Sequence, residues 1–150
     1  MQSLRSLPGR SSNGRSIAFI RIAVGLIFFT QGILKYIDPQ LGVLRFTRIG
    51  FPMPAFTARF VGAFEMICGF LVLVGLVTRL ASIPLLLVIL TAIATTKIPE
   101  LFHLNQGFWF MVSDARTDFA MTLSLLFLIS VGGGSWSLDA LIWKEDPPPN

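Results

Sequence analysis

The sequence predicts an all-α integral membrane protein, built as an antiparallel bundle of four transmembrane helices. Of its 150 residues, 53% are hydrophobic and only 13% are charged. A soluble domain of this size would need about twice that charged fraction to cover its surface. Four apolar stretches, each long enough to cross the hydrocarbon core of a bilayer, are separated by breaks that contain turn residues. The chain has room for one domain, so lipid must surround most of its surface.

The predicted transmembrane domain covers residues 17–140 and lies between two polar tails, residues 1–16 and residues 141–150, with the second rich in proline. We expect both tails to be mobile. The four spans are expected at about residues 17–37, 55–77, 80–96 and 114–131. The first apolar stretch is too long for a signal peptide and no small-residue cleavage site follows it, so it should be retained as a span.

Each span has a local signal at one of its ends. Asp38 and Pro39 end the first span. Pro54 opens the second, because the N–H that proline lacks would be unpaired at a first helical position anyway. Thr78 is a candidate N-cap for the third span, and the break before it is so short that the second and third spans should form a tight hairpin. Glycines 132–134 end the fourth span.

Glu65 is the most informative residue in the sequence. It lies about ten residues into the second span and therefore near the middle of the bilayer, at about 1.5 Å per residue. A carboxylate at that depth costs several kcal/mol unless it is paired, protonated or hydrated. Glu65 therefore indicates a ligand or proton site. The alternative is a structural hydrogen bond that clamps two helices together.

One side of the first span is polar and rich in glycine. Arg21 and Lys35 mark its two ends, and Gln31 lies next to it. The glycines of this face and of the matching face around Glu65 are Gly25, Gly32, Gly62 and Gly69. Small residues allow two transmembrane helices to approach closely, so we expect these glycines to pack the first two spans together.

The depths of the charged residues predict a polar pocket. Lys35, Arg59 and Asp118 should lie near the same membrane surface and form a cluster, with Glu65 about 9 Å deeper than Asp118. Arg21 comes from the opposite surface, and its long side chain should reach toward Glu65. The alternative for the three cations is that each extends to the lipid headgroups as an anchor.

His103 lies in an aromatic connection near the predicted pocket mouth and is a candidate ligand or proton-relay residue, although a lone loop histidine is more often polar surface. Cys68 should be a small packing residue. With one cysteine and one histidine, the chain cannot form an internal disulfide, a multi-cysteine metal site or a haem site with two histidines of its own. We therefore expect no metal and no cofactor bound by this chain alone. The scattered basic residues exclude a nucleic-acid partner.

Over about residues 17–140, the sequence resembles the DoxX family of small four-helix membrane proteins. The motifs that carry the resemblance are Arg21-x3-Gly25, Gln31-Gly32-x2-Lys35, Val61-Gly62-Ala63-Phe64-Glu65, Gly69, Gly75-x2-Thr78-Arg79, Thr117-Asp118-Phe119-Ala120 and Gly134-Ser135-Trp136-Ser137-Leu138-Asp139. One departure concerns Asp118, because family members often have a glutamate there. The shorter acid keeps the charge but changes its reach.

The resemblance implies a membrane subunit of a quinone-linked oxidoreductase system for sulfur or thiol donors or for oxidative stress, like the small subunit of a thiosulfate:quinone oxidoreductase. It also implies a bacterial or archaeal inner membrane with both termini in the cytoplasm, an orientation that the evenly divided Lys and Arg residues leave open. Glu65 and Asp118 would then be catalytic. The ligand-binding candidates are Arg21, Gln31, Lys35, Arg59 and His103.

Two other functions fit the same residues. The chain could be a non-catalytic scaffold that docks a partner enzyme, with its buried charges fixing helix register. Less favoured is a small-solute carrier, because four short spans enclose little space unless the protein is a homo-oligomer. Beyond the lipid bilayer, the expected partner is a membrane or redox subunit, and the expected ligand is a quinone.

Overall fold

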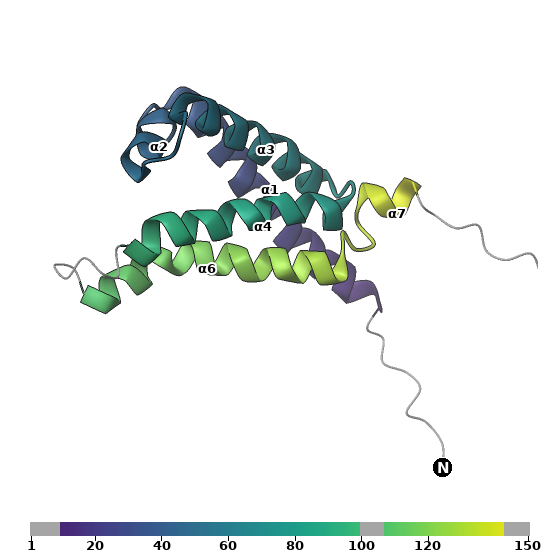
Figure 1. Ribbon diagram of the computed structural model, residues 1–150. Helices are drawn as coiled ribbons and strands as arrows, with labels where there is room; N and C mark the ends of the chain where they lie inside the picture. The colour runs from purple at the N-terminus through teal and green to yellow at the C-terminus, as the bar shows by residue number, and fades with distance from the viewer. Residues whose placement is uncertain (1–9, 100–106, 143–150) are drawn as a thin grey trace, which may run out of the picture.

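The computed structural model describes residues 10–99 and 107–142, which are helical and contain no strand (Figure 1). The long helices in this part of the chain are α1 (Arg10–Ile37), α3 (Pro54–Val74), α4 (Thr78–Ala92) and α6 (Gly107–Val131). The short ones are α2 (Val43–Ile49), a π-helix η1 (Ile93–Lys97) that continues α4, and α7 (Leu138–Ile142). The prediction of an all-helical fold is confirmed.

Three of the helical segments are long and apolar enough to cross a membrane, which makes the chain a multi-pass membrane protein. They are Gly14–Ile37, Pro54–Val74 and Thr78–Lys97. The fourth long helix, α6, has 25 residues but carries Asp114, Arg116 and Asp118 in its first half. That α6 also crosses the bilayer stays a prediction.

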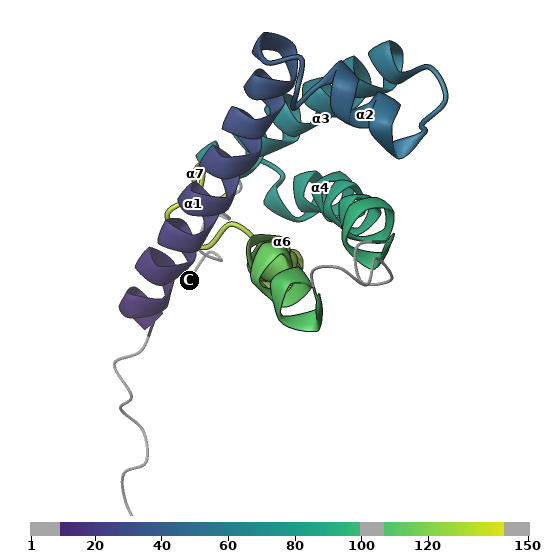
Figure 2. The same cartoon turned by 90° about the vertical axis from the view of Figure 1, so that its left-hand side faces the viewer.

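The long helices pack as two pairs, α1 with α3 and α4 with α6. The pairs lie close together near α7 and diverge toward α2, as both views show (Figures 1 and 2). All four long helices contribute to one buried apolar core, which contains Val24, Phe28, Val72, Leu85 and Leu128. At the α2 end, side chains from both pairs line one cavity.

The helix bounds differ from the expected spans at several ends. α1 begins at Arg10, so residues 10–16 are helical where we expected a mobile tail. Once a helix has formed, each further turn costs little, so the strongly apolar span extends into its polar flank. α3 ends at Val74 because Gly75 takes the left-handed conformation, with φ 78°, and α6 begins earlier than expected, at Gly107.

The backbones of α1 and α3 meet at two pairs of glycines. A Cβ placed on Gly25 would lie 2.8 Å from the carbonyl oxygen of Gly69, and one on Gly32 would lie 2.7 Å from that of Gly62. Real Cβ atoms do not approach this closely, so any side chain here would force the helices apart. The structure thus places all four glycines of the expected packing face at this contact.

We predict that Gly69→Ala destabilises the protein by about 1–3 kcal/mol, the usual cost of overpacking. Its new Cβ would lie 2.7 Å from the backbone nitrogen of Phe29. Helix propensity alone favours alanine over glycine by about 1 kcal/mol, so the sign of the change tests the close contact. Unfolding in detergent would be followed by circular dichroism. The control is Ser130→Ala on the exposed face of α6, and a stabilised Gly69→Ala variant would contradict the prediction.

Candidate functional site

A cavity of about 320 Å³ lies between the two helix pairs at the α2 end. Every described helix except α7 contributes to its wall. Most of the wall is apolar, and five threonines line it as well. The charged and amide side chains on the wall are Gln31, Lys35, Arg45, Glu65 and Asp118. Four of these five were predicted site residues, and the structure brings them to one cavity.

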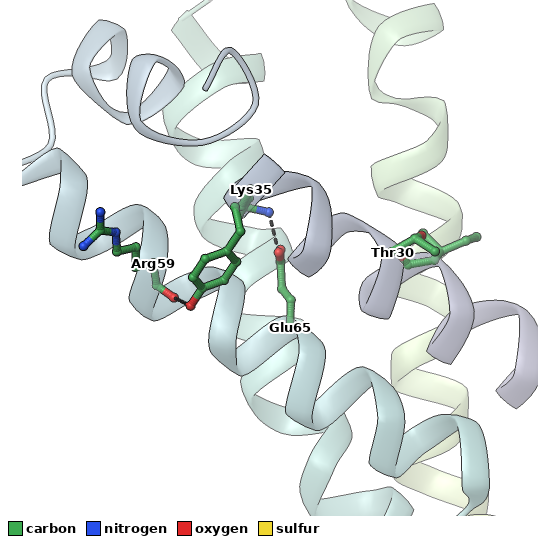
Figure 3. A network of polar contacts seen from close by, with 6 residues as sticks. Thr30, Lys35, Arg59 and Glu65 are labelled. Atoms are coloured by element: carbon green, nitrogen blue, oxygen red, sulfur yellow. Dashed lines mark hydrogen bonds and ion pairs between the residues drawn. The ribbon is translucent and has the colours of Figure 1, made fainter. Parts of the chain in front are cut away.

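Glu65 forms an ion pair with Lys35 (Figure 3). The side chains are 5% and 11% exposed, respectively. Lys35 lies in the last turn of α1 and Glu65 in the middle of α3, beside the contact between Gly32 and Gly62. The closeness of the two backbones there brings the ammonium within reach of the carboxylate. Pairing offsets part of the cost of placing each charge among apolar side chains.

The expected cluster of Lys35, Arg59 and Asp118 does not form. In the part of the chain that the structure describes, neither Arg59 nor Asp118 has an ion-pair partner. Arg59 lies outside the cavity wall and its side chain points away from Glu65, while its backbone oxygen accepts a hydrogen bond of 2.7 Å from Tyr36 Oη (Figure 3). The predicted cluster rested only on how deep each residue lies in the membrane. Arg59 lies on a different face of α3 from Glu65.

Arg21 does not reach toward Glu65, so this prediction was wrong. The residue is 4% exposed, and its guanidinium donates to the carbonyl oxygens of Gly133, at 3.0 Å, and Trp136, at 2.8 Å. These carbonyls belong to the segment that follows α6, at the end of the bundle away from the cavity. Arg21 therefore holds this segment against the bundle.

Asp139 completes the attachment of the same segment. Its carboxylate accepts hydrogen bonds from the backbone N–H groups of Val77, at 2.8 Å, and Thr78, at 3.2 Å, where α4 begins. Its own N–H donates to the carbonyl oxygen of Gly75. The cap of α4 thus comes from Asp139 and not from Thr78, whose buried hydroxyl makes no hydrogen bond with any residue that the structure describes. We call Arg21, Asp139 and the segment Gly132–Ile142 the C-terminal clamp.

Arg45 and Phe46 reach the cavity wall from α2, although neither was predicted as a site residue. The segment containing them was taken as a connection, because seven residues are too few for a span. The signal that could have found α2 is its pattern of apolar residues around Arg45 and Arg48. His103 lies outside the described residues, so its predicted role stays a prediction.

The π-helix η1 adds acceptor groups to the wall. Thr95 and Thr96 donate their hydroxyl protons to the carbonyl oxygens of Thr91 and Ala92, at 2.8 and 2.6 Å. Their hydroxyl oxygens keep lone pairs for a ligand. Lys97, the last residue of η1, forms an ion pair with Asp114 of α6. π-helical turns are rare and often occur at functional sites.

Comparison with known proteins identifies the family of the chain. The DoxX family model matches residues 16–98, which include Lys35 and Glu65. The chain belongs to the DoxX family. An uncharacterized membrane protein of Mycobacterium tuberculosis is 47% identical over 135 residues, which cover 87% of this chain and 83% of the relative. A Bacillus subtilis protein named "Putative oxidoreductase CatD" is 30% identical over 125 residues, which cover 83% and 85% of the two chains. No solved structure matches the chain.

We predict that Lys35→Met or Glu65→Met alone destabilises this DoxX protein by about 3–5 kcal/mol, because each leaves an unpaired buried charge. The double variant Lys35→Met/Glu65→Met should recover most of that loss, since two apolar side chains can replace a buried ion pair. The stabilities of all three variants are compared by their unfolding midpoints in detergent. If the stability lost by the double variant equals the sum of the losses of the two single variants, the ion pair does not exist.

A second prediction concerns the C-terminal clamp. Arg21→Gln should lower the unfolding free energy by about 2 kcal/mol or more, because hydrogen bonds from a charged donor to buried carbonyls are lost. The control is Arg48→Gln, because Arg48 is exposed and its guanidinium donates a hydrogen bond to the side chain of Gln40. Equal unfolding midpoints for the two variants would contradict the role of Arg21.

Proposed function

We propose that this protein binds the head of a quinone in the cavity and acts as a membrane subunit of a quinone-linked oxidoreductase system for sulfur or thiol donors or for oxidative stress. The observation that carries the proposal is the buried Lys35–Glu65 ion pair on the wall of a mostly apolar cavity. Ligand pockets are typically apolar, with a few polar groups that fix orientation, and begin at about 300 Å³. The cavity of about 320 Å³ is large enough for a small ring.

The chemistry of quinone reduction suits this pair. Conversion of a quinone to a quinol takes up two electrons and two protons. The ammonium of Lys35 can donate a hydrogen bond to a quinone oxygen and then a proton, while Glu65 holds the ammonium in place and can take part in its reprotonation. The electrons would come from the donor substrate or from a partner subunit. The name of the Bacillus relative supports an oxidoreductase role.

The direct test measures quinone reduction by the protein purified with its natural partners. Glu65→Gln should lower the rate by about 10²-fold or more, the usual contribution of a positioned acid or base. The double variant Lys35→Met/Glu65→Met should fold and yet be inactive, which separates chemistry from stability. The matched control is Asp114→Asn, which removes an acid that does not line the cavity.

Two outcomes would contradict the proposal. If Glu65→Gln and Asp114→Asn reduce quinone at the wild-type rate, the cavity is not the site. If the activity survives both Glu65→Gln and the double variant but disappears when the whole chain is removed, the protein is a non-catalytic scaffold for a partner enzyme. Proteoliposome uptake of a solute, sensitive to Glu65→Gln, would instead indicate a carrier.

A further inference from the structure

The cavity contains a second pair of opposite charges that do not touch each other. Arg45 projects from α2, which packs against α3, and Asp118 lies on α6, in the other helix pair. Within residues 10–99 and 107–142, neither side chain has a hydrogen bond or an ion pair with another residue. Arg45 lies close enough to Glu65 for their charges to interact. Two charged groups on a cavity wall without protein partners are available to a ligand.

The position of α2 favours this role for Arg45. The helix has no buried residues, so it is not held in place by core packing. It lies against the cavity through Arg45, Phe46 and Ile49, and the ring of Phe46 makes an edge contact with Phe51, with centroids 5.6 Å apart. Arg48, on the same helix, bonds Gln40 and does not line the cavity. The two arginines of α2 therefore differ in what they can contact.

The charges of the cavity also limit the class of ligand. The wall carries two cations, Lys35 and Arg45, and two carboxylates, Glu65 and Asp118, so the charges balance. A small dianion would bring two uncompensated charges into a mostly apolar space, which is costly. An uncharged ring with an oxygen at each end would leave the balance intact and satisfy both unpaired groups.

We propose that Arg45 and Asp118 bind the two ends of the ligand from opposite walls. Arg45 donates a hydrogen bond to an acceptor oxygen, and Asp118 accepts one from a hydroxyl. The kind of ligand rests on the proposed function. The inference adds the residues that hold the ring and the redox state that they favour. A quinol has a hydroxyl for Asp118, whereas the carbonyl of a quinone would face a carboxylate without a proton between them. The site therefore prefers the reduced form.

The test compares binding of duroquinol and duroquinone to the purified full-length chain in detergent, by calorimetry without oxygen. The wild-type protein should bind duroquinol about ten-fold more tightly, because a hydrogen bond to a charged group contributes about 1.5–3 kcal/mol. Asp118→Asn should remove or reverse this preference, since an amide can donate to a quinone carbonyl. Arg45→Gln should weaken both ligands about ten-fold, and the matched control Arg48→Gln should bind both like the wild type.

The outcomes separate this inference from the proposed function. If the wild-type protein binds neither form, the quinone site and this inference both fail. If it binds them and Arg45→Gln behaves like Arg48→Gln, only the role of Arg45 is overturned. An unchanged preference in Asp118→Asn overturns the role of Asp118. Circular dichroism checks that each variant is folded, and Arg45→Lys, which keeps the charge, should lose less affinity than Arg45→Gln.

Discussion

The contact between the backbones of α1 and α3 determines the geometry of the candidate site. Gly25 with Gly69 and Gly32 with Gly62 let the two helices touch along their length. In a bilayer, where apolar side chains gain little by leaving lipid for protein, such close packing is a main source of helix association. The same contact brings Lys35 to Glu65 and so makes a charge at mid-membrane depth tolerable. Packing and electrostatics therefore depend on the same four small residues.

The two ends of the bundle use buried charge in different ways. At the cavity end, Lys35 and Glu65 neutralise each other on the cavity wall, and Arg45 and Asp118 line the same wall without partners among the residues that the structure describes. At the other end, Arg21 and Asp139 form hydrogen bonds with backbone groups. Charges satisfied by the backbone stabilise a fold, whereas charges on a cavity wall are available for chemistry.

The helical membrane fold and the burial of Glu65 within it could be predicted from the sequence, because both follow from apolar runs and from position along a helix. The partners of Glu65, Arg21 and Arg59 could not. Depth places two residues at the same level, but the direction in which each helix face points depends on how the helices pack. Arg21 shows this clearly, because its partners are backbone carbonyls of a distant segment. Arg45 was missed because a seven-residue helix has too little periodicity to stand out in a connection.

The C-terminal clamp also has a consequence for biosynthesis. Arg21 lies in α1, and the carbonyls that it binds come 112 and 115 residues later in the chain. Until those residues have been translated and inserted, the guanidinium must be solvated by water, headgroups or the insertion machinery. The backbone N–H groups at the start of α4 likewise lack their carboxylate acceptor until Asp139 has been translated. The bundle can therefore reach its final state only after the C-terminal clamp has joined it, and until then the nascent protein is exposed to quality-control proteolysis.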